Sequence, residues 1–117
     1  MGKKTGEYGE ILSRKYLTDK GYNILANNYR TKIGEIDIIA QNKNLIVFIE
    51  VKTRRSTTFG LPREAVNYRK QRTLYKLAEQ YIQYNKIKDT DFRFDVIEVR
   101  WEKDSYSINH IENAFGN

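Results

Sequence analysis

Acidic residues interrupt the two most apolar stretches of the chain. The first stretch carries Glu35 and Asp37, and the second carries Glu50 followed two positions later by Lys52. Carboxylates among apolar residues have to be paired or bound to metal, because an isolated buried charge is strongly unfavourable. Carboxylate pairs with an open side suit Mg²⁺. These residues therefore predict either a divalent-cation site or a set of structural ion pairs.

The spacing of the two stretches predicts an antiparallel β-hairpin, because both are rich in β-branched and aromatic residues and only four residues separate them. A two-residue loop at residues 43–44 would place Asp37 opposite Glu50. The same register would place Glu35 opposite Lys52, on the face that Asp37 shares. That face keeps a charge of −2, which a divalent cation would cancel. The alternative is a cross-strand ion pair between Glu35 and Lys52, with the other acids at a wet sheet edge.

The remaining pattern predicts the elements that position this hairpin. Gly21 is expected to end the first helix, and Pro62 to lie in the first turn of the second. Because a helix separates the third and fourth strands, these two strands are expected to pair in parallel. Residues 53–60 are expected to form a mobile loop. We expect helices at residues 5–20 and around the apolar stripe of Leu74, Leu77, Ala78, Tyr81 and Ile82, and strands at 22–30, 34–40, 45–52, 92–101 and 106–112.

Composition indicates a single α/β domain over residues 1–117, with a mixed central sheet flanked by helices. Hydrophobic residues make up 39% of the 117 residues and aromatic residues 13%, which is enough for one core. No apolar run reaches the roughly 18 residues of a membrane span. The absence of cysteine excludes disulfides and thiolate metal sites. We expect a cytoplasmic protein without a membrane partner, either a monomer or a homodimer.

Positive charge is concentrated between Lys52 and Lys76. Eight basic residues and a single acid give this stretch a charge of +7, whereas the whole chain carries +6. Concentrated cation attracts polyanions, and phosphate backbones are the usual candidates. A solvated helix face is the alternative. We expect nucleic acid, most of all DNA, to contact Arg54, Arg55, Arg69 and Arg72. Tyr68, Tyr75 and Tyr84 lie in the same region and are expected to pack against the sheet rather than stack on bases.

Other charged residues have simpler interpretations. Glu10 precedes Arg14 by four residues, a spacing that favours an exposed helical ion pair. Arg93 and Asp95 share one face of a strand and are expected to neutralise each other. His110 is the only histidine, and no partner stands at ligand spacing from it, so we expect it to have no catalytic role.

Several segments together resemble the bacterial YraN family. The order of the elements, with an Asp on one strand and Glu-x-Lys on the next, also resembles the PD-(D/E)XK nuclease superfamily and is similar to archaeal Holliday-junction resolvases. Ile36 stands where the superfamily's name has Pro. The resemblance implies a restriction-endonuclease-like αβββαβ core with one extra C-terminal strand. The matching segments are Gly6-Glu7-x-Gly9-Glu10, Gly34-Glu35-Ile36-Asp37, the run from Val47 to Arg54, Phe59-Gly60 and Arg93-Phe94-Asp95.

The resemblance also implies roles for individual residues. Asp37 and Glu50 would bind Mg²⁺ or Mn²⁺, with the carbonyl of Val51 nearby. Lys52 would orient or help deprotonate the attacking water. Glu10 stands where the nuclease superfamily carries an acidic residue on its helix. Lys70, on the second helix, would contact phosphate.

These observations lead to three hypotheses. The first is a metal-dependent nuclease that hydrolyses phosphodiester bonds of DNA, including branched or single-stranded forms, with Asp37, Glu50, Lys52 and Glu10 as catalytic residues. The second is a non-catalytic nucleic-acid-binding module on the same fold. The third is a scaffold whose charges form only ion pairs.

Overall fold

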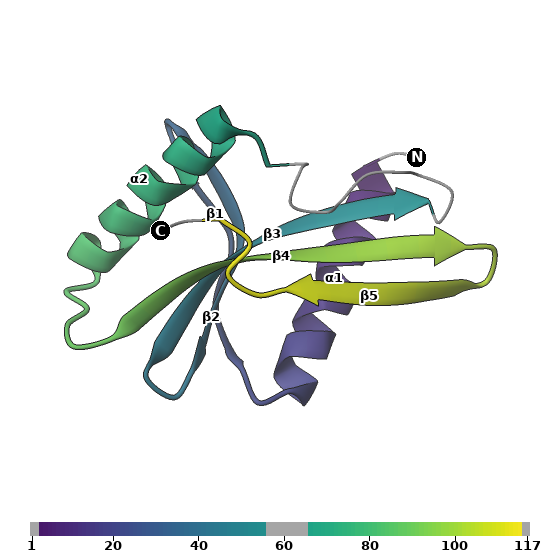
Figure 1. Ribbon diagram of the computed structural model, residues 1–117, viewed down its shortest axis with the longest axis horizontal. Coiled ribbons are helices and arrows are strands. Elements are labelled where there is room, and N and C mark those ends of the chain that lie inside the picture. The colour runs from purple at the N-terminus through teal and green to yellow at the C-terminus, as the bar shows by residue number, and fades with distance from the viewer. Residues whose placement is uncertain (1–2, 56–65, 116–117) are drawn as a thin grey trace.

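Five strands form one mixed sheet, and α1 and α2 lie on opposite sides of it (Figure 1). The computed structural model describes residues 3–55 and 66–115. No helix within these residues is long and apolar enough to cross a bilayer. The elements are α1 (Lys3–Asp19), β1 (Asn23–Thr31), β2 (Gly34–Asn42), β3 (Leu45–Arg55), α2 (Tyr68–Tyr84), β4 (Asp91–Glu102) and β5 (Ser105–Ile111).

The strands follow one another across the sheet in the order β1-β2-β3-β4-β5. The β1–β2, β2–β3 and β4–β5 pairs are antiparallel, whereas β3 and β4 pair in parallel, as the helical crossover predicted. Strand β4 therefore lies inside the sheet. β3 continues through Arg55, opposite Trp101, so the loop expected from residue 53 starts later. The rest of that predicted loop, and Pro62, lie outside the described residues.

The β2–β3 hairpin has the predicted register. Asn42 pairs with Leu45 across the turn, and the pairing continues to Ile38 opposite Ile49. The backbone ladder ends there, one residue before Asp37 and Glu50 would face each other. The two strands thus separate at the acidic residues.

Two apolar clusters fill the space between the sheet and its helices. Leu74, Leu77 and Ala78 of α2 pack on one face, which confirms the predicted stripe. Leu12 and Leu17 of α1 pack on the other face.

Strand β2 does not keep a simple alternation of faces. Ile36 and Ile39 both belong to the cluster beneath α2, whereas Ile38 belongs to the cluster beneath α1. Glu35 and Asp37 flank Ile36, and both interact electrostatically with Glu10 of α1, as expected for two acids that share one face. The regular alternation is broken only beyond Asp37, at Ile38, where β2 leaves β3.

Two glycines help to position helix α1, one after its C-terminal end and one within its N-terminal half. Gly21 adopts φ 96°, and the Tyr22 amide returns to the Leu17 carbonyl at 3.0 Å, so the predicted left-handed stop is confirmed. Near the other end, a Cβ on Gly9 would overlap the Thr53 hydroxyl of β3. This close approach brings the next residue, Glu10, over the sheet.

Helix α2 begins at Tyr68, and Asn67 caps it by accepting a hydrogen bond from the Lys70 amide at 2.9 Å. Tyr75 packs against Phe94, as expected. The same expectation is wrong for Tyr68 and Tyr84, whose side chains are 72% and 77% exposed, because they lie outside the buried stripe.

Candidate functional site

Asp37 and Glu50 meet where β2 and β3 separate. The carboxylate of Asp37 accepts a hydrogen bond from the Val51 amide at 2.8 Å, in place of the backbone acceptor that a continued ladder would supply. In an extended strand the amide and carbonyl of one residue point to the same edge. The Val51 carbonyl therefore faces the same gap as the Asp37 carboxylate.

Glu50 is a buried carboxylate whose two oxygens have different surroundings. Its side chain is only 4% exposed. One oxygen, Oε2, lies 3.4 Å from the Lys52 ammonium and 3.1 Å from the Lys70 ammonium. The other oxygen, Oε1, is buried without a hydrogen-bond partner among the described residues. A buried acceptor without a partner is costly, so this oxygen is suited to an additional ligand.

The two carboxyl groups interact directly. The pKa of Asp37 is raised to about 8, first by burial and then by the negative charge of Glu50. The hydrogen bond from Val51 acts in the opposite direction, while the charge of Glu10 and a hydrogen bond to Glu50 raise the pKa further. Two acids that resist simultaneous ionisation form a site in which a cation is favoured.

Glu10 approaches this pair from α1. Burial raises its pKa, and so do the charges of Glu35 and Glu50, whereas a hydrogen bond from Asn28 lowers it. With the Asn28 side-chain amide turned so that its nitrogen faces the two acids, that nitrogen lies 3.0 Å from Oε1 of Glu10 and 3.3 Å from Oε2 of Glu35. Arg14, the predicted ion-pair partner, also lowers the pKa of Glu10, but less than Asn28 does. Glu10 is thus directed into the site rather than along the helix surface.

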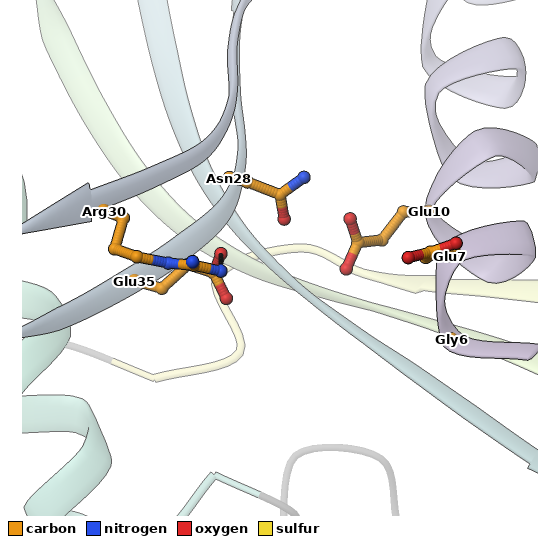
Figure 2. A pocket seen from close by; sticks show the side chains of 6 residues that line it. All are labelled: Gly6, Glu7, Glu10, Asn28, Arg30 and Glu35. Carbon is orange, nitrogen blue, oxygen red and sulfur yellow. Dashed lines mark hydrogen bonds and ion pairs between the residues drawn. The ribbon is translucent and has the colours of Figure 1, made fainter. Parts of the chain in front are cut away.

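A pocket of about 580 Å³ opens between α1 and the β1–β2 hairpin (Figure 2). Glu7 and Glu10 line one side of it, and Arg30 and Glu35 line the other. Arg30 pairs with Glu35 at 2.8 Å, and Lys52 pairs with Glu50. The alternative in which Glu35 forms an ion pair with Lys52 is therefore wrong, because Glu35 lies opposite Arg30 in the β1–β2 ladder.

The described residues allow only a small direct ligand set for a metal ion. Within residues 3–55 and 66–115, no three His, Cys, Asp or Glu side chains are grouped to hold one together. Two carboxylates and one backbone oxygen do converge, from Asp37, Glu50 and Val51. Glu10 acts at longer range, through its charge.

The predicted nucleic-acid-binding residues fall in different surroundings. Arg54 lies 3.2 Å from Glu98 and its side chain is only 15% exposed, so much of its positive charge is neutralised by an ion pair within the protein. Arg55 is exposed at the end of β3. Lys70 is directed to Glu50. Arg69 and Arg72 line an open hollow of about 440 Å³ on the flank of α2, together with Tyr68, Thr73 and Lys76.

A second polar network lies beside α1. Asp95 is fully buried, and two hydrogen bonds of 2.8 Å from Arg93 confirm that these residues neutralise each other. His110 lies 2.7 Å from Asp95 through Nε2 and 3.0 Å from the Tyr16 hydroxyl through Nδ1. Because a carboxylate only accepts, Nε2 carries the proton. Sequence spacing gave no signal for these partners, since 94 positions separate Tyr16 from His110.

The fold and the site define an α/β protein in which two carboxylates stand at the open end of a β-hairpin beside two lysines. The model of the uncharacterised protein family UPF0102, which is the YraN family, matches residues 9–99. The chain belongs to this family, and the resemblance found in its motifs is confirmed.

Relatives match along almost the whole chain. A UPF0102 protein of Alkaliphilus oremlandii is 56% identical over 117 residues, covering 98% of this chain and 100% of its own. A UPF0102 protein of Clostridium acetobutylicum is 51% identical over 117 residues, covering 98% of this chain and 96% of its own. Among solved structures, SfsA of Pyrococcus furiosus in complex with Ca²⁺ is 10% identical, with a TM-score of 0.33, covering 90% of this chain and 60% of its own.

Proposed function

We propose that this protein is a metal-dependent nuclease of the PD-(D/E)XK type that hydrolyses phosphodiester bonds in DNA. The observation that carries the proposal is the pairing of Asp37 with Glu50, whose Oε1 is buried without a partner among the described residues. Paired acids in this state favour a cation. The proposal would assign the site to Mg²⁺ or Mn²⁺.

The donor set fits such an ion. Asp37, Glu50 and the Val51 carbonyl supply only oxygen ligands, which hard divalent cations prefer, and the small number leaves room for water and phosphate oxygens. A bound cation would offset the charge that develops on the phosphate and lower the pKa of a bound water. Glu10 would act through its charge or through water.

Activation of the attacking water would depend on Lys52 and Glu10. Lys52 lies on the same strand as Glu50 and would orient the attacking water by donating a hydrogen bond to it. Its half-buried position next to a carboxylate holds the side chain in the site. Glu10 lies on α1, across the pocket from the strands, and would hold a proton or a water molecule there.

The flank of α2 would bind the substrate. Arg69, Arg72 and Lys76 present positive charge around an open hollow, and the exposed Tyr68 ring offers a surface for a base. An open hollow with an exposed ring suits the unpaired bases of single-stranded or branched DNA better than a closed duplex. Arg55 would extend the contact along β3.

The proposal is tested by metal binding and by cleavage. Titration calorimetry with Mn²⁺ should show a site in the wild type, and Asp37→Asn and Glu50→Gln should weaken it by at least about tenfold. Supercoiled, single-stranded and junction DNA should be cut only with Mg²⁺ or Mn²⁺. Glu79→Gln, an exposed acid on α2, is the matched control and should behave as the wild type. Absence of both metal binding and cleavage would exclude a nuclease on these substrates.

A non-catalytic nucleic-acid-binding module is the second candidate. The observation in its favour is that the basic hollow on α2 is built from residues other than the carboxylates. In that case DNA should bind without metal, with strong salt dependence, and Asp37→Asn should leave binding unchanged.

A further inference from the structure

Lys70 enters the carboxylate site from a different element than the other site residues. Its ammonium lies 3.1 Å from Oε2 of Glu50, closer than the 3.4 Å of Lys52. Both lysines therefore contact one oxygen, while Oε1 has no partner among the described residues. The nuclease motif accounts for Lys52 but gives no reason for a second lysine on the metal ligand.

The two side chains of the Lys70–Glu50 ion pair differ in their exposure to solvent. The Glu50 side chain is 4% exposed and fixed in the sheet, whereas the Lys70 side chain is 43% exposed. The backbone of Lys70 is anchored, because its amide donates to the Asn67 cap at 2.9 Å. The long lysine chain can thus leave Glu50 without any movement of α2.

A divalent cation and an ammonium compete for the same carboxylate. When a cation sits beside Glu50, a nearby ammonium is repelled, and the effect is large because Glu50 is buried. Of the two lysines, Lys70 is the more exposed and the nearer to water. Lys70 is therefore the one that a cation would displace.

We propose that Lys70 is a built-in counter-ion of Glu50, which occupies the site in the metal-free protein and is displaced when a divalent cation binds. This inference rests on the proposed metal site. Once displaced, the ammonium would lie on the first turn of α2 beside Arg69 and Arg72, where it can contact a phosphate. Cation entry would in this way add a positive charge to the substrate surface.

Calorimetry with Mn²⁺ tests the competition. Lys70→Gln should bind Mn²⁺ about tenfold more tightly than the wild type, since the competing charge is gone. Lys70→Arg keeps the charge and should bind as the wild type does. Lys76→Gln is the matched control, because it removes the same charge from the same helix but lines the hollow instead of contacting Glu50. Lys52 still pairs with Glu50 in Lys70→Gln, so this variant should remain folded.

Amine labelling of the wild type tests the displacement without any variant. With an acetylating reagent and mass spectrometry, the labelling rate of Lys70 should rise severalfold when Mn²⁺ is added, whereas that of Lys76 should not change. Wild-type protein that binds no Mn²⁺ would overturn the metal site and this inference together. Mn²⁺ binding with equal or weaker affinity in Lys70→Gln, or unchanged labelling of Lys70, would overturn the inference alone.

Discussion

The Val51 amide donates a hydrogen bond of 2.8 Å to the Asp37 carboxylate, at the point where β2 and β3 part. A side chain thus replaces a backbone acceptor, and the gap that opens behind it holds two acids and two lysines. The separation of the hairpin thus leaves room between β2 and β3 for these four side chains.

Asp37→Asn should reduce the pH dependence of stability. The pKa of Asp37 is raised from 3.8 to about 8, first by burial and then by Glu50. Between pH 4 and 8 the folded protein therefore keeps a proton that the unfolded chain has lost, and the free energy of unfolding falls as pH rises. Asparagine can still accept from Val51 and donate to Glu50. In urea denaturation with EDTA, the variant should lose on the order of 2 kcal/mol less than the wild type between pH 5 and 8. Equal slopes in the two proteins would contradict this.

Gly9→Ala should weaken the packing of α1 on β3. The new methyl group would overlap the Thr53 hydroxyl, so the helix or the Thr53 side chain has to move, at a cost of about 1–3 kcal/mol. Gly6→Ala is the control on the same helix, since a Cβ there meets nothing within 4 Å and alanine favours a helix. Urea denaturation should show opposite effects of the two substitutions. Thr53→Ala should partly restore the stability of Gly9→Ala.

The double substitution Arg69→Gln/Arg72→Gln should weaken DNA binding and its salt dependence. Each arginine on the hollow is expected to neutralise one phosphate, so the slope of log K against log salt should fall by about two. Fluorescence anisotropy with labelled single-stranded DNA between about 50 and 200 mM salt measures this slope. Lys88→Gln removes an exposed charge beyond the end of α2 and should leave the slope nearly unchanged. A variant with wild-type binding would show that α2 is not the contact surface.

Asp95→Asn should destabilise the fold at neutral pH. Burial alone would raise the pKa of Asp95, but hydrogen bonds from His110, Arg93 and the Asn113 amide outweigh it and lower the pKa. The ionised carboxylate therefore contributes stability above about pH 4, and the contribution is lost as pH falls through the folded pKa.

Thermal or urea unfolding at pH 7 should show a loss of about 3 kcal/mol in Asp95→Asn, because Arg93 loses its buried charged partner and keeps only the half-exposed Glu112 at 3.6 Å. The difference from the wild type should shrink towards pH 3. Asp91→Asn, an exposed acid on the same strand, is the control and should change stability by less than about 0.5 kcal/mol. A neutral result for Asp95→Asn would mean that the network contributes little to stability.

Local patterns predicted much of this fold. The register of the β2–β3 hairpin followed from its two-residue loop, and the end of α1 followed from Gly21. The parallel pairing of β3 with β4 followed from the helix between them. Each of these features depends on residues that are neighbours in the chain or on a general rule of topology.

Contacts that depend on the docking of distant elements could not be predicted in this way. Spacing alone favoured a surface ion pair for Glu10, and only the family resemblance directed it into the site. Lys70 was expected on phosphate, but the position of α2 brings it to Glu50. The ion pair of Glu35 with Arg30 was missed because it depends on the register of β1 against β2, for which the sequence offered no turn signal.

The hydrogen bonds around Asp95 have a practical consequence for anyone who shortens this protein. Similarity to the family model ends at residue 99, yet His110 and the Asn113 amide, both beyond that boundary, satisfy the Asp95 carboxylate. Truncation after residue 99 would also remove β5. Strand β4 would then become an open edge of the sheet, which favours aggregation. The segment that the family model matches is therefore smaller than the unit that folds, and expression trials should retain the last strand and the residues after it through Phe115.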